Sequence, residues 1–340
     1  MQFHNLSNSN KYKDKTMRAV IPVAGVGTRL RPHTYTLPKV LLNVAGKPIL
    51  GHILDEIIKQ GISKATIITG YMGKLIQEYV NKNYDIDVDF VPQKESLGLG
   101  HAIWVGNETY GDEPLLIILG DTIFDVNLHD IMNSEHSTIG VKEVEDPRRF
   151  GVIQTDANGF INNFVEKPET FVSNSAIVGI YYIKNPDLLK ASLNELIHGN
   201  IRTRNEYQLT DALYMMMQKG ELFKPFKVEG WYDCGKPETL LATNEFLLSR
   251  SNSIVEMKNA VIIPPVYIDP TATIENSIIG PYATVAVGAS VKDSIIKNTI
   301  ISDEAEVSTS ILEKSIIGNN AIVKGHFNCL NVGNSSEIEH

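Results

Sequence analysis

A loop of small residues near the N-terminus is followed closely by cations. The loop at 24–28 comes directly after the apolar run 19–23, and Arg29, Arg31 and Lys39 come after it. Small residues let backbone N–H groups approach an anion closely, and the cations can neutralise several phosphate charges. The combination favours a nucleoside triphosphate site, although an ordinary glycine turn would explain the loop by itself.

The spacing of this loop excludes two common nucleotide sites. Gly25 and Gly27 have no third glycine at the distance that a dinucleotide-binding fold requires. No Gly-Lys-Ser or Gly-Lys-Thr follows them, so the loop is not a P-loop. A triphosphate bound here would therefore depend on the nearby cations.

Two aspartates stand at positions that suit ligand binding. Asp121 follows the predicted strand 115–119, which places its carboxylate at the C-terminal edge of a sheet, where ligands of open α/β folds bind. Asp233 follows the aromatic pair Trp231 and Tyr232. Taken alone, Asp121 is more typical of a helix N-cap or a turn than of a ligand-binding residue.

The first part of the chain alternates short apolar strands with amphipathic helices, which predicts βαβ units over a mainly parallel, Rossmann-like sheet. Residues 49–58 place apolar pairs four residues apart and predict a buried helix face. Residues 140–250 should extend the sheet and form the far wall of a cleft. The predicted strands are 19–23, 65–69, 88–91, 115–119 and 177–183, and two further helices are predicted at 187–197 and 208–219.

After about residue 255 the apolar residues recur at six-residue intervals, three to a set. Such sets describe a triangular coil of short parallel strands, stacked about four times, which is a β-helix. A β-sandwich would need hairpin turns and alternating polarity, which the segment largely lacks. The predicted inward positions are Ile262, Ile268, Ile274, Ile279, Val285, Val291, Ile295, Ile301, Val307, Ile311, Ile317 and Val323.

Length and composition limit the number of domains, the kinds of partner and the cell compartment. A chain of 340 residues predicts two domains, here a catalytic domain at 17–250 and a β-helix at 251–340, after a polar extension at 1–16 that we expect to be disordered. A net charge of -9 argues against nucleic acid as a partner. Two cysteines far apart in sequence fit a reducing compartment, so we expect the protein to be cytoplasmic. No apolar run reaches the roughly 18 residues that span a bilayer, so we expect no membrane contact.

With these features in place, the chain resembles the sugar-1-phosphate nucleotidylyltransferases, specifically the glucose-1-phosphate thymidylyl- and uridylyltransferases that carry a left-handed β-helix tail. The resemblance runs from Met17 to the C-terminus. The matching motifs, in order, are the loop 24–32, Leu37-Pro38-Lys39, QKESLGLGHA at 93–102, Leu119-Gly120-Asp121, Val165-Glu166-Lys167-Pro168 and Trp231-Tyr232-Asp233-Cys234-Gly235.

The resemblance implies an enzyme that joins a nucleoside monophosphate, from dTTP or UTP, to a sugar 1-phosphate such as glucose 1-phosphate and releases pyrophosphate. A sugar phosphate is already mostly dianionic near neutral pH, with a second pKa of about 6, so it can attack the α-phosphorus without a general base. The barrier is electrostatic and geometric, which calls for cations and a bound Mg²⁺.

The resemblance also assigns residues to these tasks. Arg29 and Lys39 would contact the triphosphate, and Asp121 and Asp233 would bind Mg²⁺. Glu166 would accept hydrogen bonds from sugar hydroxyls while Lys167 holds the sugar phosphate. The nucleotide would contact Ala24, Gly25, Gly27, Thr28, Gln93 and Gly98, and the sugar pocket would also contain Gly151, Val178, Gly179, Tyr181 and Thr210.

Two parts of the sequence indicate different nucleotides. The short loop after Ala24 and the Gly98–Ala102 segment are similar to uridylyltransferases, whereas the tail at 328–333 is similar to long thymidylyltransferases. Thymine and uracil differ by one methyl group, which an apolar pocket distinguishes by only about 1–3 kcal/mol, so both nucleotides stay open.

Two other functions remain as alternatives. A non-catalytic regulatory or scaffold subunit could share this layout, but it would have no electrostatic need for Arg29, Lys39, Asp121 and Asp233 together. A bifunctional enzyme could transfer an acetyl group on the β-helix, near His326. The simplest role for the β-helix is to hold copies of the chain in a homo-oligomer.

Overall fold

The structure, a computed structural model, describes residues 17–251 and 257–325. The predictions for residues 1–16 and His326 lie outside these ranges. Two compact units divide the described chain: the first comprises 17–28, 34–41 and 50–231, and the second comprises 29–33, 42–49 and the residues from Tyr232 onward. The boundary between the units falls inside β13, so helix α7 belongs to the same unit as the β-helix. The catalytic domain predicted from sequence runs further, to residue 250.

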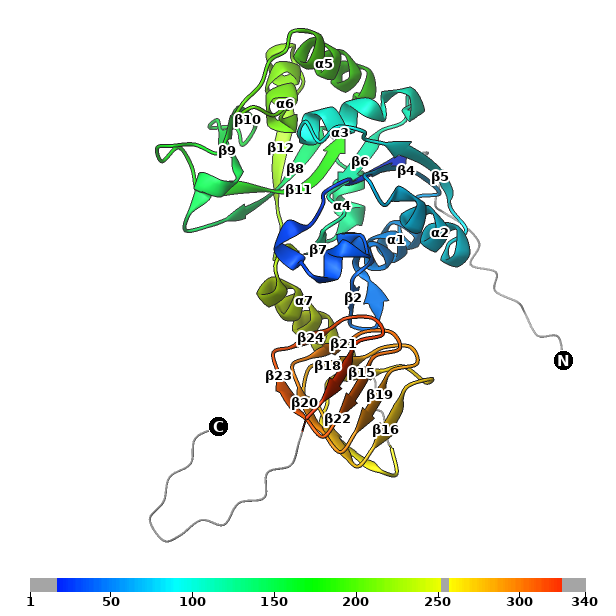
Figure 1. Ribbon diagram of the computed structural model, residues 1–340. Coiled ribbons are helices and arrows are strands. Elements are labelled where there is room, and N and C mark those ends of the chain that lie inside the picture. The colour runs from blue at the N-terminus through cyan, green and yellow to red at the C-terminus, as the bar shows by residue number, and fades with distance from the viewer. Residues whose placement is uncertain (1–16, 252–256, 326–340) are drawn as a thin grey trace, which may run out of the picture. The chain divides into compact units, whose positions relative to one another are not determined.

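The first unit is built on a nine-stranded sheet within the described residues (Figure 1). Strands β6, β1, β4 and β5 are neighbours in that order and run parallel, as the sequence predicts. Strand β11 adds antiparallel to β6 and β8, so the sheet is mixed beyond the parallel half. The strands are β1 (Arg18–Val23), β4 (Lys64–Thr69), β5 (Asp87–Pro92), β6 (Leu115–Ile118), β8 (Ser137–Glu143), β9 (Gly151–Thr155), β10 (Ile161–Glu166), β11 (Ser175–Ile183) and β12 (Phe223–Lys227).

Helices pack on this sheet through apolar faces. The predicted face at 49–58 is confirmed: α1 buries Ile49, Leu50, Ile53, Leu54 and Ile57. Leu189 and Leu193, four residues apart, lie on one face of α5, and Leu213 lies on α6. All three belong to the core beneath α3, α5 and α6. The helices of this unit are α1 (Ile49–Lys59), α2 (Gly73–Asn83), α3 (Leu99–Val105), α4 (Leu128–Met132), α5 (Pro186–His198) and α6 (Leu209–Gln218), and its short strands are β7 (Thr122–Asp125) and the start of β13 (Gly230–Asp233).

The second unit joins α7 (Pro237–Ser249), the hairpin of β2 (Asn43–Val44) and β3 (Lys47–Pro48), and a β-helix. Asn244 on α7 is fully buried and connects all three parts. Its Oδ1 accepts from Ala45 N at 2.8 Å and from Thr284 Oγ1 at 2.6 Å, and its Nδ2 donates to Tyr282 O at 3.0 Å. These three hydrogen bonds explain why α7 belongs with the β-helix in packing.

The described part of the β-helix makes four coils of three short strands, and equivalent strands pair in parallel to form three sheets (Figure 1). This is the arrangement expected of a left-handed β-helix. Its strands are β14 (Ala260–Ile262), β15 (Val266–Ile268), β16 (Thr273–Glu275), β17 (Ser277–Ile279), β18 (Ala283–Val285), β19 (Ser290–Lys292), β20 (Ile295–Lys297), β21 (Ile300–Ile301), β22 (Glu306–Ser308), β23 (Ile311–Glu313), β24 (Ile316–Ile317) and β25 (Ile322–Lys324).

Two predicted inward positions are wrong by one residue. Ile279 pairs with Ile296 and Ile296 pairs with Leu312, so these residues continue the inner column in place of Ile295 and Ile311. Ile296 is fully buried, whereas Ile295 is 41% exposed and Ile311 is 80% exposed. The step from the first to the second inner position is five residues in these coils, not six, and a shift of one residue moves a strand side chain to the opposite face.

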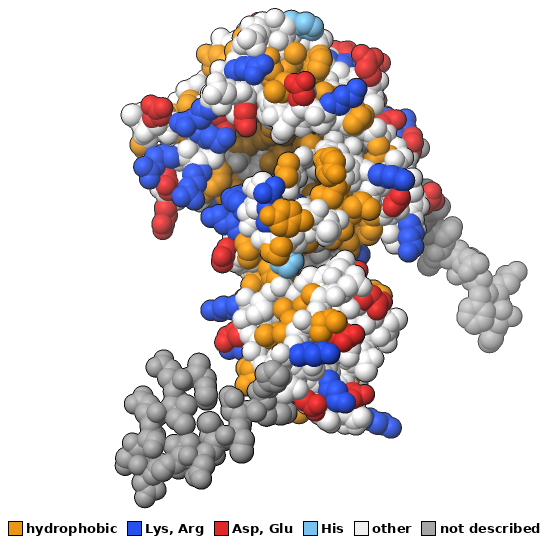
Figure 2. Space-filling model, viewed as in Figure 1, with side chains coloured by type: hydrophobic (Ala, Val, Ile, Leu, Met, Phe, Trp, Pro, Cys, Tyr) orange, Lys and Arg blue, Asp and Glu red, His pale blue; other side chains and the backbone are white. Residues whose placement is uncertain are grey.

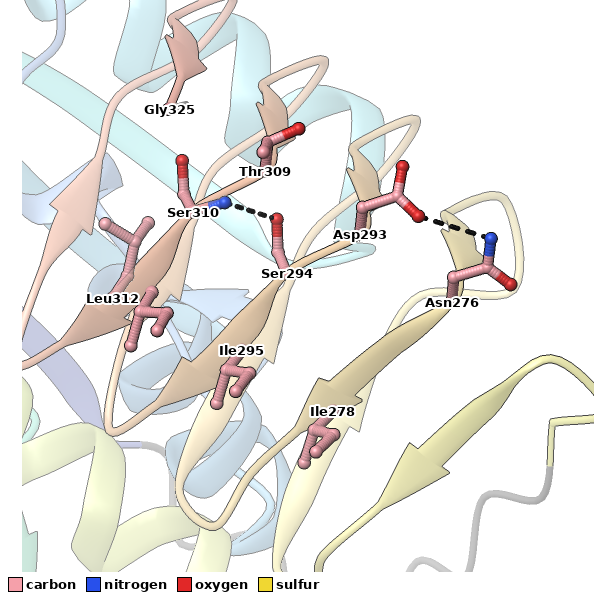
Figure 3. Close-up of a pocket in the computed structure, with 10 residues that line it drawn as sticks. Asn276, Ile278, Asp293, Ser294, Ile295, Thr309, Ser310, Leu312 and Gly325 are labelled. Atoms are coloured by element: carbon pink, nitrogen blue, oxygen red, sulfur yellow. Dashed lines mark hydrogen bonds between the residues drawn. The ribbon is translucent and has the colours of Figure 1, made fainter. Parts of the chain in front are cut away.

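The outward residues of the same sheet form an apolar row. Val261, Ile278, Ile295 and Ile311 are in register on successive coils. A groove of about 680 Å³ lies beside this row. In it Asn276 Nδ2 donates to Asp293 Oδ1 at 3.2 Å, and the backbone N–H of Ser310 donates to Ser294 Oγ at 3.1 Å (Figure 3). These polar groups are bonded within the β-helix, and the row leaves aliphatic carbon at the surface.

Candidate functional site

The predicted site residues follow the ends of parallel strands. Strands β1, β5 and β6 run in the same direction, so the loop after β1, Gln93 after β5 and Asp121 after β6 meet at one edge of the sheet. The chain adds β4 on one side of β1 and later places β6 on the other side. Ligands of open α/β sheets bind at such a switch of direction.

A pocket of about 300 Å³ lies at this edge, wholly within the first unit. It contains the predicted residues Ala24, Gly25, Lys39, Gln93, Gly98 and Asp121. On the surface of this unit, Figure 2 shows a hollow lined by apolar side chains, with lysine and arginine side chains gathered along one rim. The other residues that line the pocket are Pro22, Val23, Val40, Ser96, Leu99, Ala102, Leu119 and Glu206.

Gly27 shapes the loop against Lys39. Its φ of +66° lies in the left-handed region, and a Cβ there would lie 3.0 Å from the Lys39 Cβ and 3.1 Å from the Thr34 Cγ2. The Gly27 carbonyl also accepts from Thr34 Oγ1 at 2.8 Å. Gly25, by contrast, has open space where its Cβ would be. The loop is therefore packed on the Lys39 side and open at Gly25.

Lys39 and Asp121 form an ion pair in which the ammonium donates to Asp121 Oδ2. The lysine side chain is only 10% exposed, so it needs this partner, while Asp121 keeps 36% of its side chain exposed. Thr122 Oγ1 donates to the second carboxylate oxygen at 3.3 Å. The pair leaves a partly exposed carboxylate in the pocket beside a buried cation.

The predicted base-binding residues are held by close backbone packing. Gly98 has a φ of +109°, and a Cβ there would lie 2.6 Å from the Tyr207 carbonyl oxygen. The Gln93 amide nitrogen lies 3.3 Å from Gly98 O and 3.0 Å from His101 Nδ1. Burial lowers the pKa of His101, and the nearby Arg202 also lowers it, while Glu95 opposes them. The imidazole beside Gln93 is therefore neutral at neutral pH.

The predicted sugar-side residues form a second cluster. Thr210 Oγ1 donates to Glu166 Oε2 at 2.7 Å, and Lys167 Nζ lies 3.4 Å from Glu166 Oε1. A Cβ at Gly151 would lie 3.0 Å from Glu166 Oε2 and 3.1 Å from Thr210 Oγ1, so this glycine makes room for the pair. Burial, and secondarily the Glu166 charge, raise the pKa of the Tyr181 hydroxyl, which stays protonated.

Strand β11 connects the two clusters. Gly179 interrupts the pairing of β11 with β8, and its φ of +92° and its contact with Leu119 exclude a side chain. Leu119 N donates to Gly179 O at 2.9 Å, and Leu119 lines the nucleotide-side pocket. Val178 and Tyr181 are buried on either side of this glycine. None of the sugar-side residues lines the pocket, and Gly179 contacts it through Leu119.

Arg29 and Asp233 belong to the second unit, where they lie together. A Cβ at Gly235 would lie 2.6 Å from Arg29 Nη2 and 2.8 Å from Asp233 Oδ1, so both side chains gather over this glycine. Thr28 ends the first-unit part of the loop. Among the described residues, no three His, Cys, Asp or Glu side chains gather into a metal cluster. The predicted Mg²⁺ site, which requires Asp121 and Asp233 together, stays a prediction.

The sequence interpretation did not single out two polar residues of this site. His101 lies in the 93–102 motif, eight residues after Gln93. That spacing does not predict the hydrogen bond between the two side chains. Glu206 lines the pocket from the loop before α6 and stands in no recognised pattern. No sequence signal short of the fold itself would have found Glu206.

Comparison with known proteins decides the family. A model of the nucleotidyl transferase family matches residues 18–250. The chain belongs to this family. The matched nucleotidyl transferase domain carries both clusters described above and the strands that position them.

Individual relatives of this nucleotidyl transferase agree. The low-salt glycan biosynthesis nucleotidyltransferase Agl11 of Haloferax volcanii is 29% identical over 86% of the chain and 90% of its own length. The UTP–glucose-1-phosphate uridylyltransferase AglF of the same organism is 33% identical over 65% of the chain and 93% of its own length. A crystal structure of UDP-glucose pyrophosphorylase complexed with UDP-glucose superposes with a TM-score of 0.60 at 29% identity, covering 69% of the chain and all of that protein. The chain is thus a sugar-1-phosphate nucleotidyltransferase. No helix in the described ranges is long and apolar enough to cross a membrane.

Proposed function

We propose that this nucleotidyl transferase uses UTP, and dTTP as a second nucleotide, to convert glucose 1-phosphate into the nucleotide sugar and pyrophosphate. The observation that carries the proposal is the pocket that joins Lys39 and Asp121 to Gln93 and Gly98. It offers charge for a triphosphate next to an amide for a base edge. The names of AglF and of the solved UDP-glucose pyrophosphorylase support uracil and glucose.

The proposed chemistry is direct displacement at the α-phosphorus. Lys39 supplies positive charge beside the reacting phosphates, and Lys167 holds the phosphate of the sugar. Glu166, oriented by Thr210, accepts from sugar hydroxyls. The sugar phosphate oxygen needs no general base because it is already ionised near neutral pH.

We also propose that Mg²⁺ takes part, with Asp121 and Asp233 as its protein ligands. The donor set fits, because Mg²⁺ prefers oxygen ligands and is commonly held by one or two carboxylates together with substrate phosphates. The partly exposed Asp121 carboxylate is such a ligand. When bound, the ion would withdraw charge from the phosphates during displacement.

For the second unit we propose association of copies through the β-helix. The row of Val261, Ile278, Ile295 and Ile311 exposes aliphatic carbon on one face. His326, the residue named for the acetyl-transfer alternative, lies outside the described residues, so that alternative stays open. We propose the cytoplasm as the compartment, since two cysteines far apart in sequence fit a reducing environment.

The proposed reaction is tested by incubating the full-length protein with each nucleoside triphosphate and a panel of sugar 1-phosphates, in Mg²⁺ buffer, while pyrophosphate release is measured. We expect release with UTP and glucose 1-phosphate, weaker release with dTTP, and little with CTP or purine nucleotides. Release with none of the triphosphates would favour the regulatory or scaffold alternative.

A further inference from the structure

The Gln93 side chain lines the pocket, and both of its amide hydrogens already have acceptors within the protein. Its Nε2 lies 3.3 Å from the Gly98 carbonyl oxygen and 3.0 Å from His101 Nδ1. A carbonyl oxygen only accepts, so the amide nitrogen, not the amide oxygen, faces Gly98. No described residue donates a hydrogen bond to Gln93 Oε1. The oxygen of Gln93 is therefore the atom left for a ligand.

The contact with Gln93 determines which nitrogen of the His101 ring accepts. An amide nitrogen only donates, so His101 Nδ1, 3.0 Å from Gln93 Nε2, accepts and carries no hydrogen. The one hydrogen of the neutral imidazole is therefore on Nε2. The two amide hydrogens of Gln93 are thus held by His101 Nδ1 and by the Gly98 carbonyl.

Packing holds the ring in this position. His101 is 9% exposed and stacks on Trp104 at 5.7 Å and on Tyr207 at 6.3 Å between ring centroids. Tyr207 is itself fixed, because its carbonyl accepts from Gly100 N at 2.7 Å and its hydroxyl donates to Asn200 Oδ1 at 2.8 Å. The Arg202 guanidinium lies 4.4 Å from the Tyr207 ring centroid and favours the neutral imidazole.

We propose that His101 is a positioning residue that sets the base preference of this pocket, by holding the Gln93 amide with its oxygen toward the ligand. The proposal rests on the proposed function in that the ligand is a pyrimidine nucleotide. Uracil and thymine carry a hydrogen on N3 that Oε1 would accept. Cytosine has no hydrogen on N3, so its N3 and Gln93 Oε1 would face each other as two hydrogen-bond acceptors. The geometry therefore selects uracil or thymine over cytosine through a residue that need not touch the base.

Substitutions at His101 separate this role from simple packing. His101→Phe keeps an aromatic ring for the stack but removes the acceptor, which frees the amide to turn. We expect the KM for UTP to rise about tenfold with little change in kcat, and the preference for UTP over CTP to fall about tenfold, as expected for one lost hydrogen bond. His101→Asn returns an acceptor near the place of Nδ1 and should restore much of the preference. Trp104→Phe, which disturbs the stack without touching Gln93, is the matched control and should leave the preference unchanged.

A second measurement needs no turnover by a variant. ¹⁵N NMR of the histidine-labelled wild-type protein reports which imidazole nitrogen carries the hydrogen, with His101 assigned by the signal that His101→Phe or His101→Asn loses. We expect a bare Nδ1 and a protonated Nε2. A protonated Nδ1 would overturn the proposal, and so would a wild-type UTP-to-CTP preference in a folded His101→Phe protein that still turns over UTP. Absence of any turnover by the wild type would instead defeat the proposed function, while the NMR result would still decide the orientation of Gln93.

Discussion

Lys39 donates a hydrogen bond to Oδ2 of Asp121, which joins the segment after the phosphate loop to the residue after β6. The lysine side chain is far more buried than the aspartate side chain. Loss of the carboxylate would therefore leave a cation with little water to replace its partner. The pair makes the two proposed roles, triphosphate contact and metal ligand, depend on each other.

Asp121→Asn should lower turnover by about 100-fold or more, because the change removes the charge of one of the two proposed Mg²⁺ ligands. Thermal unfolding should also shift to lower temperature, because the amide oxygen can accept from Lys39 but carries no charge to offset the buried ammonium. Asp130→Asn, at an exposed position on α4, is the control for removing one negative charge. Turnover in Asp121→Asn equal to that of Asp130→Asn, at saturating Mg²⁺, would remove Asp121 from the mechanism.

Gly27→Ala should harm activity more than a matched glycine does. Gly27 and Gly61 have φ values of +66° and +82°, so alanine costs about 1–2 kcal/mol of backbone strain at either position. A Cβ at Gly27 also presses on Lys39, whereas a Cβ at Gly61 meets nothing within 4 Å. Both variants should therefore melt at lower temperature, but kcat should fall in Gly27→Ala alone. Equal kcat values would show that the loop does not position Lys39.

Thr210→Val should weaken use of the sugar phosphate selectively. The change removes the hydroxyl that donates to Glu166 Oε2 and leaves that carboxylate less well oriented. We expect the KM for the sugar 1-phosphate to rise about tenfold while the KM for the nucleotide stays unchanged. Thr155→Val, on the exposed end of β9, serves as the control. A rise in both KM values would assign Thr210 to general stability of the site.

Charges on the outer row of the β-helix should change the assembly without unfolding it. Ile311→Glu places the charge at a position that is 80% exposed, so the coil should remain intact while light scattering shows a smaller particle than the wild type. Ile296→Glu places the same charge at a fully buried position and should disrupt the coil. An unchanged mass in a folded Ile311→Glu protein contradicts association through this face.

The sequence predicted the elements that have strong periodic signals. The strand at 19–23 and the apolar pairs of α1 are buried as expected, because alternation and helical spacing follow directly from backbone geometry. The inner column of the β-helix was predicted correctly in its first two coils. It failed at Ile295 and Ile311 because Ile295 and Ile296, like Ile311 and Leu312, are both apolar, and hydrophobicity alone does not set the register.

Side-chain partners were beyond sequence reasoning. Lys39 and Asp121 were each singled out, but their ion pair spans 82 residues and exists only once β1 and β6 are neighbours. Asn244, which ties α7 to the β-helix, stands in no motif, and its three partners lie far away in sequence. Such contacts depend on tertiary packing, which local patterns do not encode.

The central claim is direct transfer of a nucleoside monophosphate from a pyrimidine triphosphate to a sugar 1-phosphate. It is tested most directly by a single-turnover experiment with UTP labelled at the α-phosphorus, with and without glucose 1-phosphate. We predict that all transferred label appears in the nucleotide sugar when the sugar phosphate is present, and that none stays on the denatured protein when it is absent. Label on the denatured protein in stoichiometric amount, or no labelled nucleotide sugar from folded protein, would contradict the account.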